Sequence, residues 1–198
     1  MRPRLRWIPP ALLIALLTAL AVFTRGFTAF PSTYYMTGPS MAPTLDAGDW
    51  FLTRPLVGGL PARGELVIMR YEEGDSVWHV LRRAVGLPGD TVAMRDGLLW
   101  VNRLAPGWPA RVIRFRAERT LDGPIPGTIY NWGPVVVGRD SVFVLSDTRD
   151  MIGWPDSRWL GAIPRDRIVD RYVLKLRRAS NESVQRGREI DAPVRRSC

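Results

Sequence analysis

Cysteine, histidine and lysine each occur only once in this sequence of 198 residues. Because Cys198 is the single cysteine and the last residue, an internal disulfide is excluded. A single histidine and a single cysteine cannot form the paired spacing of a metal site, and the sequence has no glycine-rich phosphate loop. We therefore expect neither a metal ion nor another cofactor. All but one of the 28 basic residues are arginine, the exception being Lys175.

The charge balance is strongly basic. With 28 basic and 19 acidic residues the formal net charge is +9, which suits anionic partners such as nucleic acid or lipid headgroups. The sequence contains no nucleic-acid-binding motif, and its N-terminal region is apolar. We therefore expect a phospholipid membrane, and not nucleic acid, as a partner of this chain.

An uncharged apolar stretch, Trp7–Thr24, lies near the N-terminus. As a helix its residues would span about 27 Å, just enough for the core of a bilayer. Arginines are concentrated before the stretch, whereas Arg25 is the only charge between it and Asp46. This asymmetry predicts a cytoplasmic N-terminus over residues 1–6 and a transmembrane signal-anchor over residues 7–24. The rest of the chain would lie on the outer face of the inner (plasma) membrane.

A cleavable signal peptide is the alternative interpretation of the same stretch. The only small-x-small triplet nearby, residues 19–21, lies inside the apolar run, whereas a cleavage site would follow the run. This placement favours a retained anchor. Aromatic rings that follow the run suit a surface at the level of the lipid headgroups. They belong to Phe27, Phe30, Tyr34 and Tyr35.

The remainder of the chain has the pattern of an all-β protein. Short segments rich in Val, Ile, Leu and aromatic residues alternate with Gly, Pro and Asp, and no long helical pattern intervenes. The expected strands are 65–70, 76–85, 97–103, 111–116, 134–138, 141–146 and 167–176. We expect a β domain over 26–176, an inserted lobe rich in Pro and Gly over 104–133, and a polar tail over 177–198.

A serine, Ser40, lies in the uncharged segment GPSMAPTL (38–45). By itself such a segment is typical of a turn, because Gly, Pro, Ser and Thr are common turn residues. Three further segments change that interpretation by their composition and order along the chain. They are RGELVIMR (63–70), RRAVGLPGDTVAMRDGLLWVN (82–102) and SDTRDMIGWPDSRWLGAIPRDRIVDR (146–171).

Taken in order after an apolar N-terminus, these four segments resemble the bacterial type I signal peptidases. The resemblance extends over roughly residues 15–175. It implies a β-sheet catalytic core with an inserted β lobe, preceded by one membrane-spanning helix. It also implies a serine endopeptidase that cleaves signal peptides from exported preproteins after small side chains.

The resemblance assigns roles to particular residues. Ser40 matches the nucleophile, and Gly38, two positions earlier, matches the residue that helps to stabilise the oxyanion. A glycine has no hydroxyl, so here only backbone or water could serve in that role. Asp147, Asp156 and Arg158 match the third motif and would form an ionic network behind the site. The spacing within that motif is about two residues longer than in the family, and the serine that helps to place the base is missing.

The base is the main departure from the family pattern. The resemblance implies a neutral lysine at position 82, where this chain has Arg82. Lowering an arginine pKa to neutrality would require about 9 kcal/mol, against about 5 kcal/mol for a lysine, so we expect Arg82 to stay charged and to orient Ser40 or an oxyanion. His79 is the alternative base. Residues 79 and 82 point to opposite faces of a regular strand, so His79 would need a bulge to reach Ser40.

Two functional hypotheses follow from this departure. The first is a working serine endopeptidase that uses Ser40 with an unconventional base. The second is a catalytically impaired homologue that binds exported chains without cleaving them. The intact Ser40 segment favours the first hypothesis, whereas Arg82 and the altered third motif favour the second.

Overall fold

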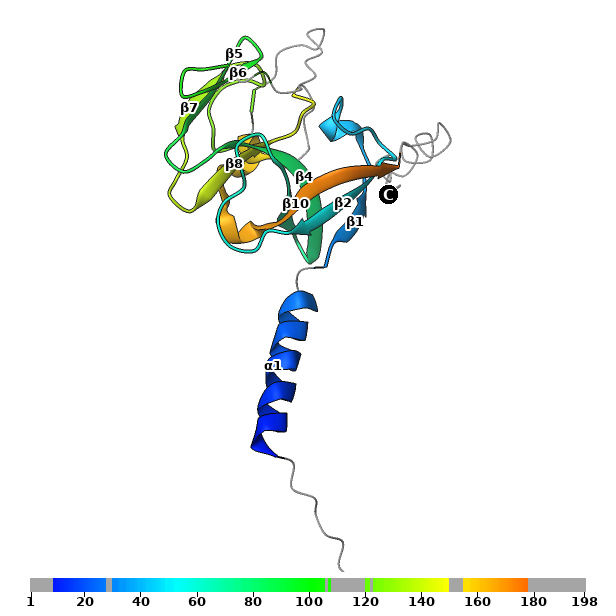
Figure 1. Cartoon of the computed structure of the whole chain (residues 1–198). Coiled ribbons are helices and arrows are strands. Elements are labelled where there is room, and N and C mark those ends of the chain that lie inside the picture. Colours follow the sequence, from blue (N-terminus) through cyan, green and yellow to red (C-terminus); the bar gives the residue numbers. More distant parts are fainter. Residues whose placement is uncertain are drawn as a thin grey trace, which may run out of the picture.

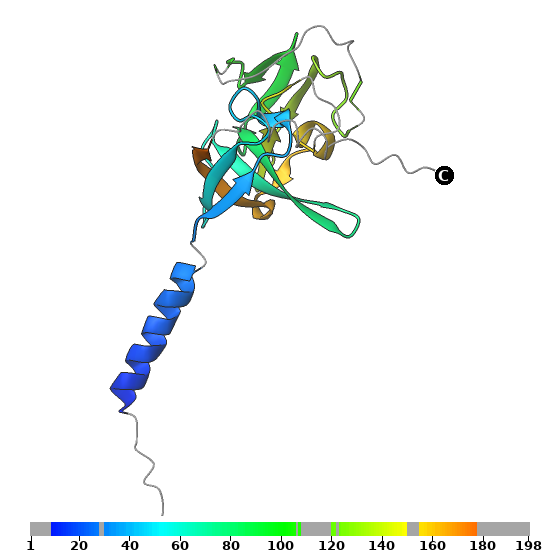
Figure 2. The ribbon, with the colours of Figure 1, turned by 90° about the vertical axis from the view of Figure 1, so that its right-hand side faces the viewer.

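The structure is a computed structural model, and it describes residues 9–27, 30–105, 107, 120–121, 123–149 and 155–177. Its first element is helix α1 (Pro10–Phe27), which stands apart from the β body (Figures 1 and 2). Its described apolar side chains are exposed; Leu12, Ile14 and Leu16 are each more than 60% exposed. The helix begins at Pro10, where a missing N–H leaves no helical hydrogen bond unmade.

The predicted transmembrane segment is not confirmed. The helix begins three residues after Trp7 and extends past Thr24 to Phe27. Within the part of the chain that the structure describes, no helix is long and apolar enough to cross a membrane.

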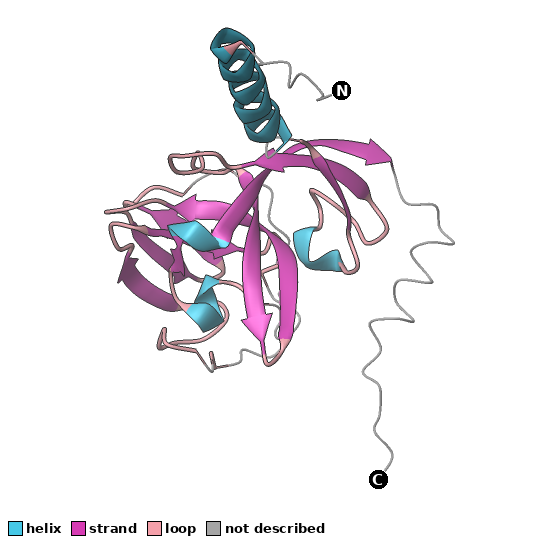
Figure 3. Ribbon diagram, turned by 90° about the horizontal axis from the view of Figure 1, so that it is seen from below, coloured by secondary structure: helices cyan, strands magenta, loops and turns pink. Residues whose placement is uncertain are grey.

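The larger sheet contains seven strands in the order β1-β2-β10-β3-β4-β8-β9. Their bounds are β1 Ser32–Tyr35, β2 Trp50–Pro55, β3 Leu66–Glu73, β4 Ser76–Gly86, β8 Ser141–Leu145, β9 Ile163–Pro164 and β10 Ile168–Arg177. All the pairings are antiparallel. The last strand, β10, pairs with β2 on one side and with β3 on the other, so it joins the β1–β2 pair to the β3–β4 hairpin. Figure 3 shows the strands of the β body in magenta, seen from below.

A smaller sheet has the order β6-β5-β7, with bounds β5 Thr91–Arg95, β6 Leu98–Val101 and β7 Trp132–Val136. The short helices of the β body are η1 Pro39–Met41, α2 Ser157–Leu160 and η2 Arg165–Arg167. Most of the predicted lobe 104–133 falls between β6 and β7. The predicted strand 111–116 lies outside the described residues, and the lobe stays a prediction.

The described β body is mostly sheet, as the sequence predicted, although four of its strands, β1, β2, β5 and β9, were missed. Strand β1 is short and polar, β2 directly follows a Gly-Asp turn, and β5 spans only TVAMR. None of the four shows a clear alternation of apolar and polar residues, because β1 and β9 are too short and the apolar residues of β2 and β5 are consecutive. Lys175, the single lysine, lies on β10 and bonds Asp49.

Buried apolar side chains form three clusters. One of them joins Met41 and Leu45, just after Ser40, to Phe51 of β2, Ile68 of β3 and Leu81 of β4. Burial of these side chains fixes the position of the Ser40 turn on the larger sheet, because each apolar side chain contributes roughly 1.5–3 kcal/mol when removed from water.

Candidate active site

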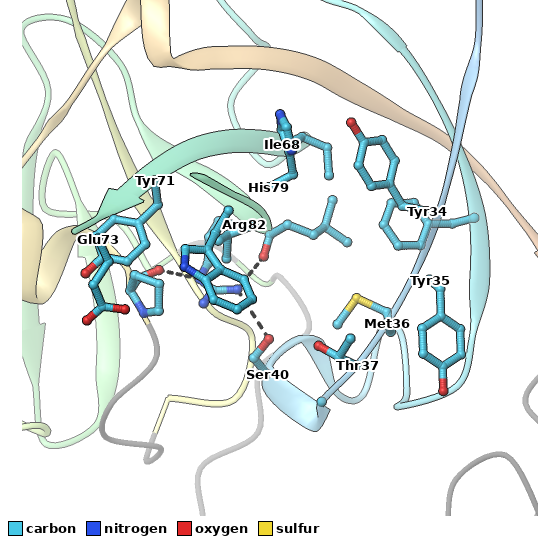
Figure 4. Close-up of a pocket in the computed structure, with 16 residues that line it drawn as sticks. Tyr34, Tyr35, Met36, Thr37, Ser40, Ile68, Tyr71, Glu73, His79 and Arg82 are labelled. Atoms are coloured by element: carbon cyan, nitrogen blue, oxygen red, sulfur yellow. Dashed lines mark hydrogen bonds between the residues drawn. The ribbon is translucent and has the colours of Figure 1, made fainter. Parts of the chain in front are cut away.

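Ser40 lies in the 3₁₀ turn η1, between β1 and β2. Pro39 begins this turn, which suits its fixed φ and missing N–H. Gly38 precedes the turn in an extended conformation and is buried. Met41, the residue after Ser40, is 0% exposed and anchors the turn in the core. The Ser40 side chain faces a pocket (Figure 4), although the residue as a whole is only 2% exposed.

Thr148 binds the backbone of the Ser40 turn. Its N–H donates to the carbonyl oxygen of Ser40 at 3.0 Å. Its hydroxyl lies within hydrogen-bond distance of the carbonyl oxygens of Pro39, at 2.7 Å, and Ala42, at 3.2 Å. Thr148, three residues past the end of β8, therefore holds the turn on both sides of Ser40, although it is more than 100 positions away in the sequence.

Arg82 approaches Ser40 from strand β4. Its Nη1 donates to Ser40 Oγ at 3.3 Å and to the carbonyl oxygen of Leu81 at 2.6 Å (Figure 4). Its Nε donates to the carbonyl oxygen of Pro155 at 2.8 Å. Only 1% of the residue is exposed, and Nη2 is buried without a hydrogen-bond partner among the described residues. The guanidinium is thus fixed in orientation, with one N–H aimed at the hydroxyl.

Burial is the main cause that lowers the pKa of Arg82 from its ordinary value to about 10. Within this net change the negative charges of Asp156 and Asp147 raise the pKa, whereas the positive charge of Arg158 lowers it. At neutral pH Arg82 is still a cation. It therefore donates to Ser40 Oγ and stabilises negative charge there, and only its rare neutral form can accept a proton.

Two buried ion pairs lie behind the serine. Arg83 binds Asp147 through two nitrogens, at 2.8 and 2.5 Å, and its Nη2 also donates to Thr44 at 3.0 Å. Arg158 binds Asp156 with Nη2 at 2.8 Å, and both residues are 0% exposed.

The charge state of the second pair is fixed by its surroundings. Although burial alone raises the pKa of Asp156, the charge and hydrogen bonds of Arg158 outweigh it and lower that pKa below its ordinary value. Ser146 donates to Asp156 from its N–H at 3.2 Å and from its hydroxyl at 3.1 Å. Asp156 is therefore ionised at neutral pH. It lies after the part of the third motif, residues 150–154, that falls outside the described residues.

The pocket in front of Ser40 has a volume of about 260 Å³. It runs along the edge of β4 on one side and along the chain between β1 and η1 on the other. Its lining is mostly apolar and aromatic. The residues are Tyr34, Tyr35, Met36, Thr37, Gly38, Ser40, Phe51, Ile68, Tyr71, Glu73, Trp78, His79, Val80, Leu81, Arg82 and Pro155.

His79 lies on the same strand as Arg82 but in a different setting. The register between β3 and β4 is regular from Ser76 to Arg83, so no bulge turns His79 toward the face of Arg82. The residue is exposed, its ring centroid lies 6.1 Å from that of Tyr34, and Figure 4 shows its ring directed away from Ser40. The bulge that a His79 base would require is thus missing from this part of the structure.

Sequence reasoning missed three participants. Thr148 and Thr44 are ordinary threonines in the sequence, and only the fold brings them to Ser40 and Asp147. Arg149 is also buried; burial lowers its pKa to about 10, and in the part of the chain that the structure describes its Nε and Nη1 have no hydrogen-bond partner. The signal that could have identified these three residues is their position inside the segments 38–45 and 146–171. Among the described residues, no group of His, Cys, Asp and Glu side chains is arranged to hold a metal ion.

Comparisons with known proteins identify the family. A family model described as signal peptidase, peptidase S26, matches residues 4–176. Signal peptidase I T of Bacillus subtilis (strain 168) is 35% identical over 162 residues, covering 80% of this chain and 78% of the relative. Signal peptidase I of Bacillus amyloliquefaciens is 34% identical, covering 79% of this chain and 78% of the relative.

A solved signal peptidase I from Enterococcus faecalis V583 covers 60% of this chain and 100% of its own, at 23% identity and a TM-score of 0.42. The assignment therefore depends on the sequence matches, which span most of both chains. They also give the enzyme class, a serine endopeptidase of the hydrolases. The chain belongs to the signal peptidase family, peptidase S26.

Proposed function

We propose that this chain cleaves signal peptides from exported preproteins, with Ser40 as the nucleophile. The observation that carries the proposal is the contact of 3.3 Å between Arg82 Nη1 and Ser40 Oγ inside a mostly apolar pocket. A serine hydroxyl needs activation to attack an amide. A fixed cation beside the oxygen lowers the free energy of the alkoxide that forms.

In the proposed reaction, Ser40 Oγ attacks the carbonyl carbon of the scissile bond while the hydroxyl proton leaves. The carbonyl electrons move to oxygen and form an oxyanion. Ser40 lies in the first turn of a 3₁₀ helix, where backbone N–H groups lack acceptors within the helix. Its own N–H is therefore a candidate oxyanion donor, with Gly38 beside it. The amine of the mature protein then leaves with a proton, and water hydrolyses the acyl-enzyme.

In this proposal the proton acceptor is the rare neutral form of Arg82, whereas the sequence alone predicted that Arg82 stays charged. With a pKa of about 10, about 0.1% of Arg82 is neutral at pH 7 and about 10% at pH 9. Cleavage is then slow at neutral pH, because few molecules hold a competent base. The proposal thus combines an intact nucleophile with a base that is rarely in its active form.

The pocket supports an extended substrate with small side chains next to the cut. Strand β4 pairs with β8 only from Arg83 onward, so in the described part of the chain its edge from Ser76 to Arg82 has no strand beside it on that side. A substrate segment can add to such an edge through backbone hydrogen bonds. Ser40 and Arg82 are almost fully buried, which leaves little room for a large side chain beside them.

We further propose that α1, with the residues before it, anchors the enzyme in the lipid bilayer. The support is the exposed apolar surface of α1 and the arginines that precede it. A contiguous apolar surface of this kind marks a membrane or protein contact. The arginine distribution favours a cytoplasmic N-terminus and a β domain on the outer face of the plasma membrane.

A second candidate function is binding of exported chains without cleavage. The charged state of Arg82 at neutral pH favours it, since a protonated guanidinium cannot accept the Ser40 proton.

Cleavage of a preprotein by the purified full chain separates the two functions. We expect slow, specific release of the signal peptide after a small residue, and no release by Ser40→Ala. If wild type and Ser40→Ala are equally inactive up to pH 10 but bind the preprotein equally, the chain is a binding protein.

A further inference from the structure

One face of the β3–β4 hairpin carries Arg82 at its buried end and an acidic group at its exposed end. In the antiparallel register, Val67 lies opposite Arg82, Tyr71 opposite Trp78, and Glu73 opposite Ser76. Alternate residues of a strand share a face, so these positions lie on one side of the hairpin. The pocket in front of Ser40 extends along this face from Arg82 to Glu73.

The outer part of the pocket combines aromatic rings with a carboxylate. Trp78 is 54% exposed, and Tyr71 is partly buried beside it on the neighbouring strand. Glu73 lies next to Tyr71 in Figure 4, and its side chain is exposed. In the described part of the chain, no ion pair or hydrogen bond engages its carboxylate. Aromatic faces and a free carboxylate together attract an ammonium or guanidinium group.

The adjacent acidic residue, Glu72, differs from Glu73 in the face on which it lies and in having an ion-pair partner. Glu72 lies on the other face of the strand and pairs with Arg70, whose Nε is 3.3 Å from Glu72 Oε1. Within the pocket lining, Glu73 is the only acidic group, and the positive charge of Arg82 is buried and already bonded to carbonyl oxygens. The accessible charge at the outer end of this pocket is therefore negative, although the chain carries a net charge of +9.

We infer that Glu73, Tyr71 and Trp78 form a subsite that selects a basic side chain of the substrate. The inference rests on the proposed function, because it assumes that the substrate chain lies along β4. Trp78 and Arg82 are separated by four residues of strand β4, or about 13 Å. The basic side chain would therefore stand about four residues from the bond that is cut.

The test is a set of peptides with one cleavage sequence, in which a single lysine replaces alanine at each position near the cut. For the full-length wild-type enzyme, we expect kcat/KM to rise about fivefold for lysine at one position about four residues from the cut. Glu73→Gln should bring that ratio of lysine to alanine peptide to about one, and Glu73→Lys should reverse it. The matched control Glu72→Gln removes the same charge from the other face and should keep the wild-type ratio.

A second measurement keeps the inference testable if cleavage itself fails. Full-length Ser40→Ala should bind the preferred lysine peptide about fivefold more tightly than the alanine peptide, and the difference should disappear in Ser40→Ala with Glu73→Gln. Equal ratios at all positions in both assays would overturn the inference. If the alanine peptide is cleaved but lysine changes kcat/KM at no position, the proposed function is kept and only this subsite is rejected.

Discussion

Thr148 donates its backbone N–H to the carbonyl oxygen of Ser40, over 3.0 Å. Together with the hydroxyl contacts to Pro39 and Ala42, this bond ties the proposed nucleophile to the end of β8. The orientation of Ser40 therefore depends on a residue that does not itself line the pocket.

We expect Thr148→Val to lower kcat about tenfold with little change in KM, because the turn loses its side-chain hydrogen bond while the pocket keeps its lining. Steady-state kinetics on a signal-peptide substrate provide the measurement. Thr148→Ser keeps the hydroxyl and should restore most of the rate. A general loss of fold would instead lower the rate of both variants together with their thermal stability.

Arg82→Lys should raise the rate of cleavage at pH 8 by about 10²–10⁴-fold, the usual contribution of a general base. The new amine would reach the position of Nη1 beside Ser40, and burial lowers a lysine pKa toward neutrality. The gain is measured on a peptide with small residues before the cut. His79→Ala in the same background should leave it nearly intact. A fast wild type that His79→Ala inactivates would identify His79 as the base.

The pH dependence of the wild type follows from the lowered pKa of Arg82. Since that pKa is about 10, the neutral fraction increases about tenfold per pH unit below this value. We expect kcat/KM to rise with pH from 7 toward 10 and then to level off, whereas Arg82→Lys should reach its plateau at lower pH. A wild-type rate that is constant from pH 7 to 9 would restrict Arg82 to the role of hydrogen-bond donor.

Asp156→Asn should destabilise the β domain by about 3–5 kcal/mol, because it leaves the buried Arg158 without its counter-charge. Urea unfolding at pH 7 measures the loss, and Asp75→Asn in the exposed turn of the β3–β4 hairpin is the control. The pKa of Asp156 is lowered in the folded state. Its contribution is therefore present above its unfolded value and disappears as the pH falls through the folded value. The variant should lose less stability than wild type on acidification.

The membrane proposal predicts a chain that keeps its N-terminus. Mature protein from cells should begin at or near Met1, and protease added outside spheroplasts should digest the β domain. The net positive charge should also favour binding to anionic vesicles, measured by co-sedimentation at low salt. An N-terminus mapped beyond residue 21 on protein free of membrane would refute the retained anchor.

The sequence predicted the mostly β architecture and the placement of residue 82 beside Ser40, since the order of four motifs carried that information. It also predicted from strand alternation that His79 lies off the face of Arg82. The contacts of Thr148 and Thr44 could not be predicted from the sequence, because they depend on how the chain after β8 packs against the Ser40 turn. The sequence also could not show which of Glu72 and Glu73 faces the pocket, because the two have the same chemistry and only the strand register places them on different faces.

The position of β10 in the sheet has a consequence for the order of assembly. Ser40 belongs to the β1–β2 pair and Arg82 to the β3–β4 hairpin, and in the larger sheet only residues 168–177 join these two pairs. Contacts between such distant segments form late, since loop closure precedes them. During synthesis the serine and the arginine therefore meet only after nearly the whole chain has emerged. The proposed active site is therefore incomplete while the N-terminal part of the chain is being made, so a nascent chain cannot cleave its own N-terminal segment.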